Sequence, residues 1–147
     1  MKIAIASDHA GLALKTTLIK HLKARRVPVT DYGTQDTQRT DYPLFAEKVV
    51  KAVLSHKAER GILICGTGVG MSITANKFHG IRAAVCSEPY SAVLSRQHNN
   101  ANVLCMGGRV VGEGLANLIV DQWLAAEYEG GRHQKRLDII KNFEDQY

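Results

Sequence analysis

The stretch GILICGTGVGMS, residues 61–72, decides the fold of this chain. A short apolar run ends at Cys65, three glycines then alternate with other residues, and a helical pattern resumes. This order is typical of a buried strand, a tight loop and the N-terminus of a helix. Such a loop directs successive backbone N–H groups into one concavity, and the helix dipole adds positive potential there.

Cys65 stands at the mouth of this concavity, where the positive potential favours thiolate over thiol. A base or nucleophile beside an anion hole is a catalytic arrangement. The alternative is a glycine-rich turn at the edge of an ordinary sheet, with Cys65 as a small buried hydrophobe. A dinucleotide fingerprint would need glycine at Met71, and a P-loop would need Lys-Ser/Thr where Met71-Ser72 stands. The loop is therefore suited to a small anion.

Length and composition are those of one globular domain over residues 1–147, with 45% hydrophobic and 22% charged residues. No apolar run is long enough to span a membrane, and the N-terminus does not resemble a signal peptide. The three cysteines, an odd number, argue against a disulfide scaffold and predict a reducing, cytoplasmic location. Cys86 and Cys105 each close an apolar run and are expected to be structural, and no zinc-type spacing is present.

The net charge of +5 is spread over several predicted helices, without the basic stripe and interleaved aromatics of a nucleic-acid-binding protein. We therefore expect neither nucleic acid nor a membrane as a partner. One basic cluster, residues 132–136, stands near the C-terminus. A small phosphorylated ligand explains this cluster, and so does a solvated helix face.

Alternating strand and helix patterns continue along the whole chain. The expected strands cover residues 2–7, 27–32, 61–65, 81–86 and 102–106, and Pro28 places the second at an edge. The first expected helix ends near residue 25, and the second begins near residue 43. The other expected helices cover residues 71–78, 89–98, 113–127 and 132–143. This order predicts an α/β fold, a Rossmann-like three-layer αβα sandwich with a five-stranded parallel sheet and a C-terminal helical arm over 130–147. The loops at 8–9, 65–70, 87–88 and 107–109 should then share one edge.

Seven motifs, in order and at compatible spacing, resemble the type B ribose-5-phosphate isomerases: SDHAG (7–11), RTDYP (39–43), CGTGVG (65–70), ANK (75–77), CSEPYSA (86–92), SRQHN (95–99) and YEGGRHQ (128–134). The wider family includes isomerases of six-carbon sugar phosphates. The resemblance implies interconversion of D-ribose 5-phosphate and D-ribulose 5-phosphate through a cis-enediolate, without a metal or another cofactor.

The resemblance also implies roles for the glycine loop. Cys65 matches the base that moves the proton, whereas one branch of the family uses a glutamate where Met71 stands here. Thr67 matches a hydroxyl that contacts the reacting oxygens; alternatively, it only bonds the helix N-terminus. The enediolate oxygen would be held by backbone amides of the loop, namely those of Gly66, Thr67, Gly68, Val69 and Gly70.

Further site residues come from other motifs. His98 matches the acid/base that opens the furanose, and Asp8 matches a residue near the ring oxygen that shares this work. His9 matches a phosphate contact, Tyr42 lines the sugar site, and Asn99 matches a ligand of sugar hydroxyls.

Three arginines match the phosphate clamp: Arg109, Arg132 and Arg136. Arg132 and Arg136 are four residues apart, so they project from one helix face and can converge on one dianion. In the family this arm reaches across a two-fold axis, which implies a homodimer with composite active sites, or a tetramer. Gly130-Gly131 makes such an excursion sterically easy.

Two other functions are compatible with these motifs. One is an isomerase of a six-carbon sugar phosphate, such as allose 6-phosphate or galactose 6-phosphate. The other is a sugar-phosphate-binding subunit without catalysis. Cys65, Thr67 and His98 together argue against the second, because binding alone requires none of them.

Overall fold

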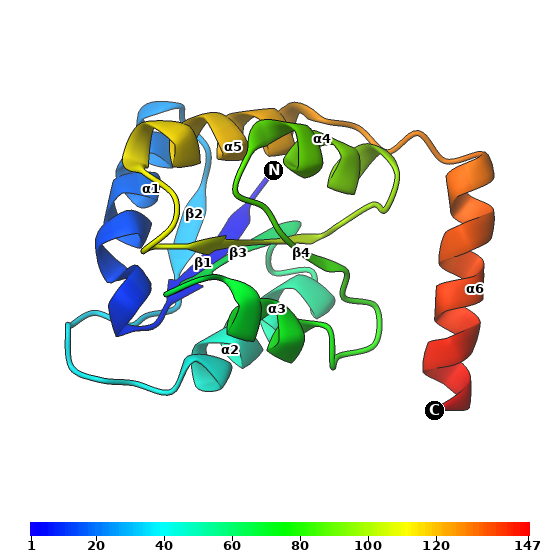
Figure 1. Ribbon diagram of the computed structural model, residues 1–147, viewed down its shortest axis with the longest axis horizontal. Coiled ribbons are helices and arrows are strands. Elements are labelled where there is room, and N and C mark those ends of the chain that lie inside the picture. The colour runs from blue at the N-terminus through cyan, green and yellow to red at the C-terminus, as the bar shows by residue number, and fades with distance from the viewer.

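The computed structural model describes residues 1–147, in which strands and helices alternate around one sheet (Figure 1). All five strands are parallel, in the order β2-β1-β3-β5-β4. They are β1 Ile3–Ser7, β2 Val29–Asp31, β3 Arg60–Cys65, β4 Ala83–Val85 and β5 Val103–Gly107. The helices are α1 Leu12–Ala24, α2 Tyr42–Leu54, α3 Val69–Ala75, α4 Pro89–Gln97, α5 Glu113–Ala125 and α6 Arg132–Gln146, with a 3-10 turn η1 at His9–Gly11. The predicted fold class is confirmed.

Two apolar layers cover the two faces of the sheet. Side chains alternate along each strand, so Ile62 and Ile64 face one layer and Leu63 and Cys65 face the other. The first layer contains residues of α1, α4 and α5, including the fully buried Trp123. The second contains residues of α2 and α3. This is the three-layer arrangement that the alternating pattern predicts.

Element boundaries differ from the predicted ones in places that have local causes. Helix α3 begins earlier than expected because Gly68, at φ +82°, turns the chain directly into it. It also ends earlier, at the point where the Asn76 side chain bonds the start of β4. This side chain accepts from Ala83 N at 2.8 Å and donates to Ala83 O at 2.9 Å. Strand β4 is shorter than expected, and β2 is an edge strand as Pro28 predicts.

The chain passes to different faces of the sheet after β3 and after its two neighbouring strands. From β3 the chain passes to α3 on one face, whereas from the neighbouring β1 and β5 it passes to α1 and α5 on the other. The loops therefore diverge around the carboxyl end of β3, as at a topological switch point.

Helix α6 is set apart from the layers, at the opposite end from the carboxyl ends of the strands (Figure 1). His133 and Leu137 are its two buried residues. Both glycines before it, Gly130 and Gly131, have positive φ, so the excursion uses the backbone freedom that the sequence predicts. No helix of the chain has the length and apolar character needed to cross a membrane.

Candidate active site

Three of the four loops predicted to share the carboxyl edge of the sheet are joined there: those after β1, β3 and β5. Asp8 N donates to Ile64 O at 3.2 Å, which joins the end of β1 to β3. On the other side Gly108 N donates to Cys65 O at 2.8 Å and Arg109 N to Gly66 O at 3.1 Å. The loops after β1, β3 and β5 are thus held to one another through their backbones.

Cys65 lies at the centre of this edge and is 5% exposed. Its Sγ accepts a hydrogen bond from Gly68 N at 3.1 Å. This bond closes the glycine loop around the sulfur, with a backbone N–H directed at it. Gly68 must be glycine, because a Cβ there would lie 2.8 Å from the Met106 carbonyl carbon, in addition to the strain of its positive φ.

The other two thiols have a different character. Burial, and secondarily the charge of Glu88, raises the pKa of Cys86 to about 11. Burial raises the pKa of Cys105 as well. Both are therefore held as thiols in the core, as expected for structural cysteines, and Cys65 is the thiol that reaches the loop edge.

Thr67 and Arg109 flank the glycine loop. Thr67 Oγ1 accepts from Val69 N at 3.3 Å, so its hydroxyl does bond the start of α3. Because that bond uses an oxygen lone pair, the hydroxyl proton remains available for a ligand. The Arg109 guanidinium lies over Gly66, with Nη1 3.4 Å from where a Cβ would stand. A positive charge thus faces the loop.

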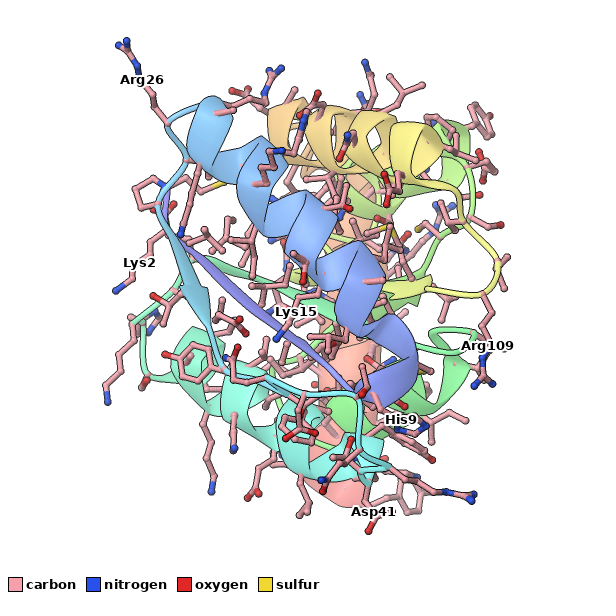
Figure 2. The ribbon with its side chains drawn as sticks, turned by 90° about the vertical axis from the view of Figure 1, so that its left-hand side faces the viewer. Lys2, His9, Lys15, Arg26, Asp41 and Arg109 are labelled. Carbon is pink, nitrogen blue, oxygen red and sulfur yellow. The ribbon has the colours of Figure 1, made fainter.

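Asp8, His9 and Tyr42 complete this cluster, and Figure 2 shows His9 and Arg109 on the same side of the molecule. Asp8 Oδ1 accepts from Ala10 N at 3.0 Å and Gly11 N at 3.1 Å, which fixes its carboxylate. His9 Nδ1 accepts from Thr40 N at 3.2 Å, so the proton of a neutral ring is placed on Nε2. The Tyr42 ring covers Gly70.

His98 and Asn99 lie in a second cluster, at the corner between α4 and β5. Two arginines brace this corner. Arg82 Nε donates to Asn99 O at 3.0 Å and Asn100 O at 3.1 Å, and Arg96 Nη1 donates to Ala101 O at 2.7 Å. Asn100 itself is left-handed, at φ 47°. Desolvation, followed by the charges of neighbouring arginines, lowers the pKa of Arg96 to about 10.

His133 belongs to this second cluster and was missed as a site residue in the sequence. Its ring stacks on His98 with centroids 4.2 Å apart and an interplanar angle of 10°. Its Nε2 lies 3.4 Å from Glu129 Oε2 and 3.5 Å from Arg132 Nε. Desolvation, then the positive charges of its neighbours, lowers the pKa of His133. The motif that contains it was visible, but its stacking on a residue of α4 is a tertiary contact.

The two clusters stand at opposite ends of the sheet. In the ladder, Gly61 pairs with Val103 and Cys65 with Gly107, so β5 runs the whole way between them. Four residue steps of about 3.3 Å give a separation of about 13 Å along the strands alone. Within one chain, the first cluster joins Cys65 with other predicted site residues: Asp8, His9, Thr67, Tyr42 and Arg109. The second cluster joins His98 with Asn99 and Arg132. The structure of one chain does not bring these two clusters together. Arg136 follows Arg132 on α6.

One group of side chains has the composition of a metal site. Donor atoms of His98, Glu129 and His133 lie within 4.8 Å of one another. However, imidazole lone pairs lie in the ring plane, and two nearly parallel stacked rings cannot direct them to one point. Arg132 beside His133 adds a positive charge that opposes a cation. The group therefore lacks the donor geometry of a metal site.

Comparisons with known proteins identify the family of this chain. The sequence model of the family described as Ribose/Galactose Isomerase matches residues 3–140. Ribose-5-phosphate isomerase B of Escherichia coli is 59% identical over 97% of this chain and 96% of its own length. A structure of ribose-5-phosphate isomerase B from Clostridium thermocellum superposes with a TM-score of 0.99 at 53% identity, covering 100% of this chain and 99% of the other. The structure of ribose-5-phosphate isomerase B from Mycoplasma genitalium, solved with bound ribulose 5-phosphate, superposes with a TM-score of 0.94 at 45% identity. The match covers 99% of this chain and 97% of the other.

The lowered pKa of His133 predicts how stability depends on pH. An unfolded histidine takes up a proton near pH 6.5, whereas the folded protein resists protonation of His133 until a lower pH. The free energy of unfolding should therefore fall as pH decreases through this window. His133→Asn should make the decrease shallower, as measured by urea unfolding at several pH values between 7.5 and 4.5. The control is His56→Asn, a change at an exposed residue. It should keep the wild-type slope of the free energy of unfolding against pH. Equal slopes for His133→Asn and wild type would contradict the prediction.

Proposed function

Because this chain belongs to the ribose/galactose isomerase family, we propose that it interconverts D-ribose 5-phosphate and D-ribulose 5-phosphate, with Cys65 as the base. The observation that carries the proposal is the Cys65 thiol at the carboxyl end of β3, bonded to Gly68 N–H and faced by Arg109. The names of the relatives support the reaction, as does the ribulose 5-phosphate bound to the Mycoplasma genitalium structure. No feature of the structure favours a six-carbon substrate or a subunit without catalysis.

The isomerisation moves one proton and leaves a charged intermediate. The Cys65 thiolate takes the proton from C2 of the open-chain aldose. The electrons of the C–H bond form the C1–C2 double bond, and negative charge develops on the former carbonyl oxygen. We assign the stabilisation of that oxygen, and the exchange of protons between O1 and O2, to amides of loop 66–70 and to the Thr67 hydroxyl. Return of the Cys65 proton to C1 completes the ketose.

Ring opening precedes this step for a cyclic substrate. We assign it to His98 with Asp8: one group removes the proton of the anomeric hydroxyl, and a proton is delivered to the ring oxygen. Asn99 and Tyr42 contact sugar hydroxyls. The phosphate is held by His9 Nε2–H and by the arginines 109, 132 and 136, whose donors suit a dianion.

These roles require two chains, since the clusters that contain them lie at opposite ends of one sheet. In a two-fold homodimer the Cys65 edge of one chain meets the His98 corner and α6 arm of the other, which gives two composite sites. Apolar side chains of α6 support such packing: Ile139, Ile140 and Phe143 are 47%, 45% and 57% exposed. These residues lie at helical spacings of three and four, so they form one face. Residues 130–147 are thus proposed as an arm that packs on the partner.

A cytoplasmic role in pentose-phosphate metabolism fits the same chemistry. All three cysteines are free thiols, and the proposed mechanism requires one of them in reduced form. A reducing compartment maintains this state.

Replacement of the base tests the function directly. Cys65→Ala should lower kcat for ribose 5-phosphate by about 10²–10⁴-fold, because no carboxylate on this loop can replace the thiol. Ribulose 5-phosphate binding, measured by calorimetry, should be largely retained. Ketose formation is followed by its absorbance after ribose 5-phosphate is added to pure protein.

Cys86→Ala is the matched control, because it makes the same chemical change at a buried thiol away from the loop. It should keep the wild-type kcat. A Cys65→Ala enzyme with near-normal turnover would remove Cys65 from the mechanism, and a wild-type protein without ketose formation would refute the proposed reaction.

Mixing of two inactive variants tests the composite site. A Cys65→Ala chain and a His98→Asn chain each lack a function in every site of their own homodimers. In a mixed dimer one site collects both defects and the other is intact. Equal amounts at random exchange give half mixed dimers, so about a quarter of wild-type activity should return.

Exchange must first be verified by tagging one variant and recovering both chains. If exchange is complete and activity is still absent, Cys65 and His98 act in the same chain and the composite site is wrong.

A further inference from the structure

Lys15 is a buried charged residue for which the proposed mechanism has no use. It lies on α1, between that helix and the end of β2, and is 1% exposed. Its Nζ donates to Asp31 Oδ1 at 2.7 Å and to the backbone carbonyl of Thr34. Figure 2 shows the side chain directed from α1 toward the segment that leaves β2.

Stability alone is a weak explanation for this pair. Removing an ammonium group from water is costly, and a buried ion pair is often no more stabilising than apolar side chains of similar volume. The pair does, however, fix the path of the backbone after β2. The Lys15 ammonium donates to both the Asp31 carboxylate and the Thr34 carbonyl, so the pair selects one backbone path.

That path begins the loop between β2 and α2, residues 32–41. Asp31 Oδ1 also accepts from Gly33 N at 2.9 Å, which closes the turn around the Lys15 ammonium. Ser7 N donates to Gly33 O and Thr34 N to Ser7 O, each at 2.7 Å. The first part of the loop is therefore fixed against the end of β1, directly before Asp8.

The far part of the same loop reaches the candidate active site. Thr40 N donates to His9 Nδ1, and Tyr42, the first residue of α2, covers Gly70. In Figure 2 the loop runs from beside Lys15 to the neighbourhood of His9 and Asp41. Residues 35–39 between these two attachments are exposed. The loop is thus attached at two points, and Lys15 makes the buried one together with the backbone of Ser7.

We propose that Lys15 is a positioning residue for the phosphate contact of His9. By fixing the loop at Thr34, it holds the Thr40 N–H against His9 Nδ1, and this bond keeps the ring proton on Nε2, where it can donate to a phosphate oxygen. The proposal rests on the proposed function only for the identity of that ligand. The coupling between Lys15 and the His9 tautomer is a property of the protein itself.

Lys15→Met tests the coupling, because methionine fills similar volume but makes neither hydrogen bond. The KM for ribose 5-phosphate should rise about tenfold with kcat within about twofold, because the phosphate is remote from the reacting carbons and its binding is shared by ground and transition states. In the ligand-free dimer, ¹⁵N NMR of the imidazoles should show His9 changing from the Nε2–H tautomer to a mixture.

Two variants separate positioning from stability. Asp31→Asn leaves the Lys15 ammonium buried without its countercharge and should lower Tm and raise KM. The Lys15→Met/Asp31→Asn double variant removes the buried charge, so it should recover Tm relative to Asp31→Asn while KM stays high. Leu18→Ala, a core truncation on the same helix, is the matched control: Tm falls, while KM and the His9 tautomer stay as in wild type.

A Lys15→Met protein with lowered Tm, wild-type KM and an unchanged His9 tautomer would overturn the proposal. So would a KM that recovers with Tm in the double variant. If wild-type protein did not isomerise ribose 5-phosphate, the proposed function would fail, yet the NMR measurement would still decide whether Lys15 controls His9.

Discussion

Close backbone contact among three loops at the carboxyl edge of the sheet is the constraint on which the site depends. A Cβ on Gly11 would lie 2.7 Å from Ile64 O, and one on Gly108 would lie 2.7 Å from Ala10 O. On the other side of β3, a Cβ on Gly107 would lie 2.8 Å from Thr67 Cα. The loops can interlock only because glycine stands at these positions. This close contact brings Arg109 over Gly66 and leaves Cys65 among the three loops. The glycines thus determine where the positive charge of Arg109 lies relative to Cys65.

The sheet that assembles the Cys65 cluster at its carboxyl edge also separates it from the His98 cluster. Helix α4 runs back along the sheet from the end of β4, so its C-terminus, with His98, lies beside the amino ends of the strands. No side-chain movement spans that separation. A chain built in this way holds Cys65, its glycine loop and Arg109 at one end, and the stacked His98 and His133 with Arg132 at the other. In the proposed homodimer, each end of one chain would meet the opposite end of the other, as a two-fold, isologous interface requires.

Local patterns in the sequence predicted the features that local chemistry decides. Pro28 identified the edge strand, the glycine pattern after Cys65 identified the loop, and Gly130-Gly131 identified the break before α6. Contacts between distant segments could not be predicted in this way. Lys15 has the spacing of an ordinary helical lysine, and its burial follows from Asp31 and Thr34 on another element. The stacking of His133 on His98 likewise depends on how α6 meets the end of α4.

The proposed dimer also changes where substrate selectivity resides. In a one-chain site, the distance between the base and the phosphate clamp is fixed by the fold. Here Cys65, His9 and Arg109 would belong to one chain and Arg132 and Arg136 to the other, so the docking of the two chains sets where the two arginines of α6 stand relative to the base. A small rotation at the interface would lengthen or shorten the site with every catalytic residue unchanged. The exposed apolar face of α6, through Ile139, Ile140 and Phe143, is then part of the determinant of sugar length, because it sets the position of the arm that carries the arginines.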